Sequence, residues 1–200
     1  VDYIEDWLKD EFIEHVLACS VNPEVVKKSG LKVLYTPLNG TGNKPVRRVL
    51  KKLGVEDLRV VKSQEKPDGK FPTCPYPNPE IRQVFEEGLK MTEEFPADLM
   101  IATDPDCDRV GIAVRDNGEY KLMTGNEVGA MLCEYLLSEL KAKNKLPEKP
   151  VVVKTIVTTP LISAICKEYN AEMADLLTGF KYIGEQIKWF EEKGVGHYEF

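Results

Sequence analysis

The sequence has no apolar run that approaches the length of a membrane span, and no secretory leader is visible in it. Cysteine is sparse, with five residues among 200, and no two of them form the CxxC pair of many zinc and redox sites. Scattered cysteines of this kind are typical of free thiols in a reducing compartment. We therefore expect a cytoplasmic protein without a membrane partner.

Clustered positive charge is also missing. The 27 Lys and Arg residues are outnumbered by 33 Asp and Glu residues, which leaves a formal net charge of -6, and the basic residues are spread along the chain. A nucleic-acid-binding surface needs a concentrated basic face to neutralise phosphates. The sequence therefore argues against nucleic acid as the main partner. Its 42% hydrophobic and 30% charged residues are ordinary for a globular protein.

The signatures of nucleophilic hydrolases are absent. The two histidines, His15 and His197, have no nucleophile or metal partner at a readable spacing. No serine lies in a nucleophile-elbow context, so a Ser-His-Asp mechanism is not supported.

Gly40-Thr41-Gly42 stands between a predicted strand and a predicted helix, where the N–H groups of the helix N-terminus could hold a phosphate. The dinucleotide fingerprint would need glycine at the position of Pro45, however, and the Gly-Lys-Ser/Thr ending of a P-loop is missing. A tight turn is therefore the favoured interpretation of this motif, and a phosphate cradle is the weaker one.

Strand-like and helix-like segments alternate along the chain, which is the pattern of a layered α/β protein. Helices are predicted at residues 3–17, 23–30, 45–53, 80–94, 125–143, 161–169 and 182–193. Strands are predicted at 31–36, from 60, within 97–114 around an acidic turn, at 151–157 and 171–176, and from 198 to the end. A loop with five prolines runs from 65 to 79. We place a domain boundary near Lys121, which gives two layered domains, 1–120 and 121–200.

Three carboxylates at alternate positions, Asp104, Asp106 and Asp108, directly follow the apolar run 99–102. In extended backbone such residues share one face, so all three side chains can converge on one point. Two carboxylates roughly 5 Å apart repel by about 3 kcal/mol at an effective dielectric near 20, and a bound cation would relieve this repulsion. Oxygen-only donors select a hard ion, Mg²⁺ or Mn²⁺ before Zn²⁺.

The acid spacing of this turn also allows two other interpretations. An EF-hand loop begins with a similar acid spacing but needs Gly at its sixth position and Glu at its twelfth, where this chain has Arg109 and Arg115, so it is excluded. A solvated acidic turn, in which Arg109 supplies the countercharge, stays open from the spacing alone.

A second strand-to-helix turn, Thr178-Gly179-Phe180-Lys181, places a hydroxyl and a cation at the mouth of a helix. Such a loop could bind a sugar or a phosphate, although by itself it is more often an N-cap and a surface lysine. Trp7 and Trp189 fall on apolar helix faces and are predicted to be core residues.

Five motifs, in the same order along the chain, resemble those of the α-D-phosphohexomutase superfamily, and in particular its bacterial phosphoglucomutase branch. They are Tyr35-Thr36-Pro37-Leu38-Asn39-Gly40-Thr41-Gly42, Pro67-Asp68-Gly69-Lys70-Phe71-Pro72 with Pro77-Asn78-Pro79-Glu80, Asp104-Pro105-Asp106-Cys107-Asp108-Arg109, Gly125-Asn126-Glu127, and Leu177-Thr178-Gly179-Phe180-Lys181-Tyr182-Ile183-Gly184. Asn39 stands where the family usually has histidine, and Asn cannot act as a base near neutral pH. The resemblance covers nearly the whole chain and favours the metal site over the solvated turn.

The resemblance implies an α/β fold with mixed sheets, in which 1–120 correspond to domain 2 and 121–200 to most of domain 3 of a four-domain enzyme. The parent would interconvert glucose 1-phosphate and glucose 6-phosphate, or the mannose phosphates, through a phosphoserine and a bisphosphorylated intermediate. Asp104, Asp106 and Asp108 would hold Mg²⁺ beside that phosphoserine, and Arg109 would contact phosphate oxygens. The turn 178–181 would recognise the sugar phosphate substrate, with Lys181 as a candidate for proton transfer or phosphate contact.

The family's phosphoserine loop, its Gly-Glu-Glu-Ser loop and its phosphate-binding loop do not occur in this sequence, which also begins at Val1 without Met. We therefore expect an excised piece of a longer protein, inactive alone, whose missing partners are domains 1 and 4 of the same chain. We also expect the acidic turn and the turn 178–181 to face a common opening. Two alternatives stay open: a non-catalytic metal-binding or interaction module, and a dinucleotide-binding enzyme that rests only on Gly40 and Gly42.

Overall fold

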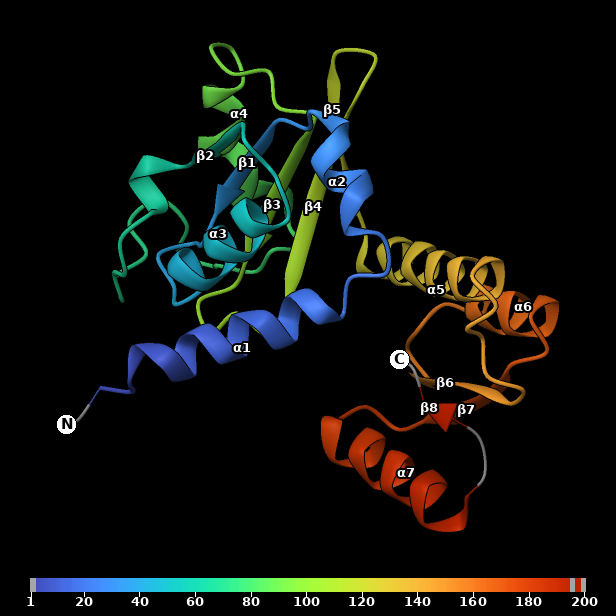
Figure 1. Ribbon diagram of the computed structural model, residues 1–200. Helices are drawn as coiled ribbons and strands as arrows, with labels where there is room; N and C mark the ends of the chain where they lie inside the picture. The colour runs from blue at the N-terminus through green and yellow to red at the C-terminus, as the bar shows by residue number, and fades with distance from the viewer. Residues whose placement is uncertain (1–2, 195–196, 199–200) are drawn as a thin grey trace. The chain divides into compact units, whose positions relative to one another are not determined.

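The computed structural model describes residues 3–194 and 197–198, and the chain divides into two compact units after Gly125 (Figure 1). Each unit is a sheet with helices packed on it, so the predicted α/β class is confirmed. The division into domains 1–120 and 121–200 stays a prediction. In the structure the strand that contains Lys121 pairs with the strand before it, which keeps residues 121–123 in the first unit.

The first unit contains a five-stranded mixed sheet with the order β2-β1-β3-β4-β5. Strands β2, β1 and β3 are parallel, and β4 and β5 continue the sheet as antiparallel neighbours. The elements are α1 (Asp6–Ala18), α2 (Pro23–Ser29), β1 (Val33–Thr36), α3 (Asn43–Lys52), β2 (Leu58–Val60), the 3-10 turns η1 (Lys62–Gln64) and η2 (Arg82–Phe85), α4 (Glu86–Met91), β3 (Leu99–Thr103), β4 (Val110–Asp116) and β5 (Glu119–Met123).

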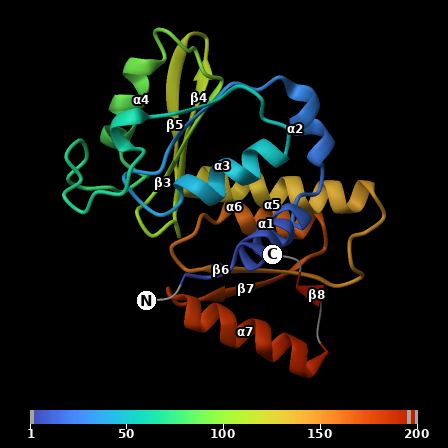
Figure 2. The ribbon, with the colours of Figure 1, turned by 60° about the vertical axis from the view of Figure 1, so that its left-hand side comes forward.

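Strand β1 is buried on both faces because helices cover both sides of the sheet. Leu34 packs into a core cluster with Val84 and Phe85 next to α4, and Tyr35, on the opposite face, is fully buried close to the start of α3. Figure 2 shows α4 on one side of this sheet and α3 on the other. A central parallel strand that is apolar on both faces is the arrangement expected of a layered α/β domain.

The helix predicted at 80–94 is shorter in the structure, where only η2 and α4 are helical. The side chain of Asn78 accepts a hydrogen bond from the backbone N–H of Glu80 (3.0 Å), and Ile81 is extended. Because Ile81 is extended, a continuous helix cannot start at Glu80, and the helical turns begin at Arg82. The proline-rich segment 65–79 forms a loop, as predicted.

The second unit contains a sheet of parallel described strands with the order β7-β6-β8. Its elements are α5 (Gly125–Ala142), β6 (Pro150–Thr155), α6 (Leu161–Glu168), β7 (Glu172–Leu176), α7 (Phe180–Lys193) and β8 (His197–Tyr198). Helices α5 and α6 cover one face of the sheet, and α7 lies on the other face in both views (Figures 1 and 2). Tyr198 belongs to the strand predicted at the end of the chain, and Glu199 and Phe200 lie outside the described residues.

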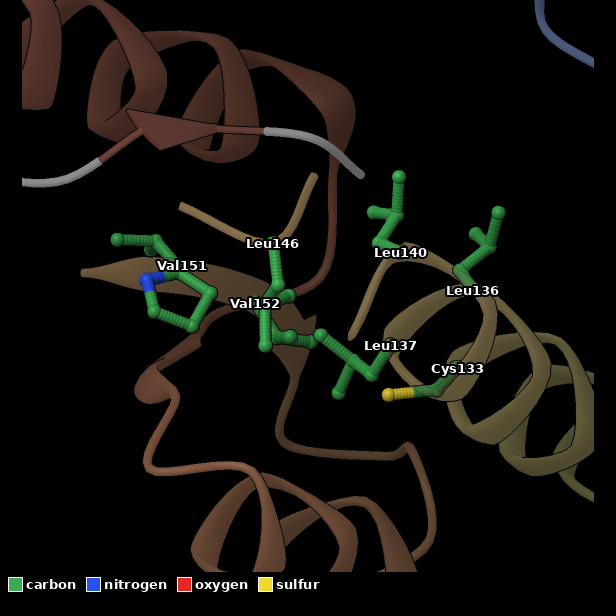
Figure 3. A pocket seen from close by; sticks show the side chains of 8 residues that line it. Cys133, Leu136, Leu137, Leu140, Leu146, Val151 and Val152 are labelled. Carbon is green, nitrogen blue, oxygen red and sulfur yellow. The ribbon is translucent and has the colours of Figure 1, made fainter. Parts of the chain in front are cut away.

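The contact between α5 and β6 leaves a pocket of about 20 Å³ that is lined by apolar side chains and Cys133 (Figure 3). This volume has room for about one water molecule, so the pocket is a packing gap rather than a ligand site. Within the described residues, no helix is long and apolar enough to cross a membrane.

The prediction that both tryptophans are core residues is wrong. Trp7 is 62% exposed and Trp189 is 46% exposed. In each helix a different position provides the buried contact, namely Ile13 in α1 and Phe190 in α7. Helical periodicity marks an apolar face correctly but does not say which residue of that face reaches the core.

Candidate metal centre

The acidic turn lies at one edge of the first sheet. Because β1, β2 and β3 are parallel, the loops that follow them all leave from the same edge. These loops contain Asn39 after β1, Gln64 after β2, and the acidic turn 104–109 after β3. The sheet topology therefore brings the first and third predicted motifs together, although about 65 residues separate them in sequence.

Asp104, Asp106 and Asp108 converge as predicted. Each contributes one carboxylate oxygen to a group whose members all lie within 4.8 Å of one another. The backbone is a turn rather than an extended strand, because Cys107 has φ +65° and its N–H donates to the carbonyl of Asp104 (3.0 Å). Asp104 is fully buried, whereas Asp106 and Asp108 are exposed, so the group opens to solvent on one side.

Arg109 holds the buried member of the group. Its backbone N–H donates to Oδ1 of Asp104, and its side-chain Nε donates to Oδ2 of the same carboxylate, both at 2.9 Å. Nε also lies 3.7 Å from a carboxylate oxygen of Asp108, and the Arg109 side chain is 53% exposed. The predicted countercharge is thus present, but one guanidinium against three carboxylates leaves a deficit of two positive charges.

The carboxylates perturb one another in the direction expected of crowded like charges. A hydrogen bond to Asp104, followed by desolvation and the negative charges of Asp104 and Asp106, raises the pKa of Asp108. Burial acts to raise the pKa of Asp104, but hydrogen bonds outweigh it and lower that pKa, first those from the backbone and side chain of Arg109 and then those with Asp108 and Asp106. A further positive charge at this point would favour the ionised form of all three residues.

Asn39, where the resemblance raised the question of a missing histidine, has a structural role. It is buried with φ +58°, and its side-chain amide donates to the backbone carbonyls of Ser63 (3.4 Å) and Lys66 (2.8 Å). Its own backbone N–H donates to the carbonyl of Gln64 (2.8 Å). Asn is one of the residues that tolerate positive φ, so this position ties the loop after β1 to the loop after β2. Sequence reasoning missed these contacts, for which the chain carries no local signal.

The turn Thr178-Gly179-Phe180-Lys181 lies in the second unit. Thr178 and Gly179 join β7 to α7, whereas Phe180 and Lys181 belong to the first turn of the helix. All four are exposed, Phe180 by 83%, and Gly179 has φ +131°. The Lys181 Nζ lies 4.7 Å from the ring centroid of Tyr182, which holds the cation against its own helix.

The first unit is thus an α/β domain with a candidate centre for a hard divalent cation. Two family models match the chain: phosphoglucomutase/phosphomannomutase alpha/beta/alpha domain II over residues 10–118, and domain III of the same enzymes over residues 124–196. The chain belongs to the phosphoglucomutase/phosphomannomutase family, which confirms the predicted resemblance.

Relatives of known name agree with this assignment. A phosphoglucomutase of Staphylococcus aureus is 34% identical over 169 residues, which are 84% of this chain and 30% of that protein. A protein of Haemophilus influenzae named probable phosphomannomutase is 33% identical over 179 residues, which are 89% of this chain and 36% of that protein. The chain therefore spans about a third of the length of the curated relatives it matches.

Solved structures share the fold. A phosphoglucomutase/phosphomannomutase family protein of Burkholderia thailandensis matches with a TM-score of 0.69 at 19% identity, over 94% of this chain and 36% of that chain. An N-acetylphosphoglucosamine mutase of Aspergillus fumigatus, in complex with glucose 1,6-bisphosphate, matches with a TM-score of 0.58 at 21% identity, over 94% of this chain and 35% of that chain. At these identities the likeness establishes the fold alone, and it confirms the predicted phosphohexomutase type.

Proposed function

We propose that this chain is the metal-binding and sugar-recognising part of a phosphohexomutase. The parent protein would interconvert glucose 1-phosphate and glucose 6-phosphate, or the corresponding mannose phosphates, with a phosphoserine as phosphoryl donor and a bisphosphorylated sugar as intermediate. The observation that carries the proposal is the convergence of three carboxylates, with a deficit of two positive charges, in a chain of this family. The five free cysteines support a cytoplasmic location as part of the same proposal.

The donor set fits Mg²⁺. Asp104, Asp106 and Asp108 offer only oxygen atoms, which hard ions prefer, and the exposed side of the group leaves room for water or a phosphate oxygen. When bound, Mg²⁺ would supply electrophilic neutralisation of the charge on a phosphoryl group. Asp104 would be the fixed ligand, because Arg109 holds both of its oxygens, while Asp106 and Asp108 would be free to adjust.

The remaining predicted residues would orient the substrate. The Nε of Arg109 donates a hydrogen bond to Asp104. The rest of its half-exposed, planar guanidinium would face phosphate oxygens next to the ion. In the second unit, Thr178 and Gly179 would offer a hydroxyl and a backbone of positive φ to the sugar, and exposed Lys181 would contact phosphate or move a proton. Exposure of all four residues of that turn supports this assignment.

Metal binding can be tested on the 200-residue chain by calorimetry with Mg²⁺ and Mn²⁺. We expect weak binding to the wild type, with a Kd on the order of 1 mM, because three carboxylates are only part of the shell that such ions take. Asp106→Ala removes an exposed ligand and should weaken binding at least tenfold. Glu93→Ala, which removes an exposed carboxylate elsewhere in the same unit, should leave binding unchanged. Indistinguishable titrations of the wild type and Asp106→Ala would contradict the proposal.

We also propose that the chain has no mutase activity by itself, since phosphoryl transfer needs a phosphorylated serine and the five family motifs in this chain include none. A coupled assay for the conversion of glucose 1-phosphate to glucose 6-phosphate, primed with glucose 1,6-bisphosphate, should give the background rate. A complete phosphoglucomutase added to the same mixture is the positive control. Turnover that follows the concentration of the purified chain and disappears in Asp106→Ala would refute this part of the proposal.

A further inference from the structure

We propose that Gly40, Thr41 and Gly42 are positioning residues for the metal centre: they form a glycine seat on which the acidic turn 104–109 rests. This inference rests on the proposed metal-binding function and deepens it. It assigns a role to the Gly-Thr-Gly motif, for which the sequence left a tight turn and a phosphate cradle as alternatives.

Gly40 allows the closest approach between the two loops. A Cβ atom at this position would lie 2.3 Å from the Cα of Pro105 and 2.5 Å from its carbonyl oxygen. Carbon atoms in contact stand roughly 3.5 Å apart, so any side chain at Gly40 would push the backbone of Pro105 away by about 1 Å. Pro105 lies directly between Asp104 and Asp106, so two of the three ligands would move with it.

Thr41 fixes the orientation of the same peptide. Its backbone N–H donates to the carbonyl oxygen of Pro105 at 2.8 Å, and its hydroxyl donates to the same oxygen at 3.1 Å. Two donors on one carbonyl define both the position and the direction of the Pro105 carbonyl group. Asp104 precedes Pro105 and Asp106 follows it, so two of the three ligands are attached to the residue that Thr41 holds. The contact spans 64 positions of sequence.

Gly42 supports the opposite end of the acidic turn. A Cβ atom there would lie 2.8 Å from Sγ of Cys107, 2.6 Å from the hydroxyl of Tyr35 and 2.8 Å from Oγ1 of Thr103. Tyr35 and Thr103 are buried and share a hydrogen bond of 2.8 Å. Residues on both sides of Asp104 and Asp106 are therefore packed against a position that has room only for hydrogen.

The same hydrogen bonds argue against the phosphate cradle. The N–H of Thr41 is directed to Pro105, and the N–H of Gly40 donates to the carbonyl of Pro37 at 2.8 Å. Two of the donors that would hold a phosphate are thus engaged inside the protein. The motif therefore positions the metal ligands and does not itself bind phosphate. The positions of those ligands matter because Mg²⁺ demands near-octahedral geometry at 2.0–2.1 Å.

The test is Mn²⁺ binding to the 200-residue chain, measured by the loss of the electron paramagnetic resonance signal of the free ion. Gly40 does not have a positive φ, so the backbone tolerates Gly40→Ala, and the three atoms nearest to the added Cβ all belong to Pro105. We expect at least tenfold weaker binding with far-ultraviolet circular dichroism unchanged. Gly69→Ala is the matched control, because a Cβ at Gly69 meets nothing within 4 Å, and it should bind as the wild type does. Val84→Ala, a core truncation, should lower thermal stability without weakening binding.

The outcomes separate the two proposals. A wild type that binds no Mn²⁺ would overturn the proposed metal function, and this inference with it. A wild type that binds, together with Gly40→Ala that binds equally well, would overturn the glycine seat alone. Should Gly40→Ala fail to fold, Thr41→Val decides: loss of one hydrogen bond to Pro105 should weaken binding on the order of threefold and Thr41→Ser should restore it, whereas wild-type affinity in Thr41→Val would overturn the seat.

Discussion

At the scale of single residues, the five cysteines differ sharply in their surroundings. Cys133 and Cys166 are buried in the core between α5, α6 and β6, and Cys74 is buried in the first unit. Burial, followed by the proximity of the Cys166 thiol, raises the pKa of Cys133 to about 11. Cys19 is exposed, and Cys107, in the acidic turn, is half-buried. Reactivity depends on the thiolate and on access, so the two groups of cysteines should separate in labelling.

Alkylation of the native chain with iodoacetamide at pH 8, followed by mass spectrometry, should modify Cys19 and Cys107 first. Cys133 should react slowest, since a pKa of about 11 leaves roughly one thiol in a thousand ionised at pH 8, and its burial in the core keeps the reagent out. In urea all five should react alike, which is the control. Equal rates for Cys133 and Cys19 in the native chain would contradict the described core.

The raised pKa of Cys133 also predicts that the stability of the folded chain falls as the pH rises. In the unfolded chain this thiol ionises near pH 8.5, whereas in the folded chain it keeps its proton up to about pH 11. The folded state therefore holds more protons between these values, and its stability falls as the pH rises through them. Below about pH 8.5 the contribution of Cys133 to stability is complete.

The convergence of the carboxylates was predictable because Asp104, Asp106 and Asp108 lie within five residues, where local backbone geometry decides the outcome. The partners of those residues were not predictable to the same degree. Arg109 follows the triad directly, and its role as countercharge was anticipated. Thr41, by contrast, reaches Pro105 only through the pairing of β1 with β3, and no local pattern encodes a contact over that separation.

At the scale of secondary-structure elements, β6 and β7 are joined by an ion pair within the sheet. Lys154 and Asp175 are register partners, and Nζ of Lys154 donates to Oδ2 of Asp175 at 2.8 Å. The Lys154 side chain is 7% exposed and that of Asp175 is 42% exposed, so the ammonium is the more deeply buried charge. Removal of one partner from such a pair costs more than replacement of the buried charge by an apolar group.

We therefore expect Asp175→Ala to lower the free energy of unfolding by about 1–2 kcal/mol, because the buried ammonium loses its carboxylate while the half-exposed site lets water compensate in part. Lys154→Met, which removes the charge and keeps the length, should cost less. Urea unfolding in a Trp7→Phe background would follow the second unit through the fluorescence of Trp189. The order of the two variants is the decisive result, and a larger loss in Lys154→Met would contradict the assignment.

Elements with strong signals at their ends were predicted closely, and an element without such signals was not. Helix α2 begins at Pro23 and ends before Gly30, which has φ +62°, as the sequence indicated. The hairpin between β4 and β5 turns at Asn117 and Gly118, both with positive φ, which is typical of Asn-Gly hairpin turns. The prediction of a long helix at 80–94 was wrong because Ile81 is extended in the structure, which helical periodicity does not indicate.

At the scale of the whole molecule, the division after Gly125 separates the two predicted functions. The acidic turn and the glycine seat belong to the first unit, and the turn 178–181 belongs to the second. The sequence indicated two domains and the family to which they belong, because several motifs cover most of the chain and do not depend on the exact ends of elements. The boundary near Lys121 stays a prediction, and in the structure β5 continues the first sheet to Met123 through pairing with β4.

The order in which the first unit assembles follows from the topology of its sheet. Strands β3 and β4 are antiparallel neighbours joined by the acidic turn, so they form a hairpin whose contacts are local. Strand β1 pairs in parallel with β3 from 66 positions away, with Val33 opposite Leu99, and such long-range pairing is slow because a long loop must close first. We therefore expect the three carboxylates to meet early in folding and to acquire their final spacing only when β1 docks. The unit would then bind a metal ion only after β1 has docked on β3, so the rate of this docking step would limit how fast metal binding develops during folding.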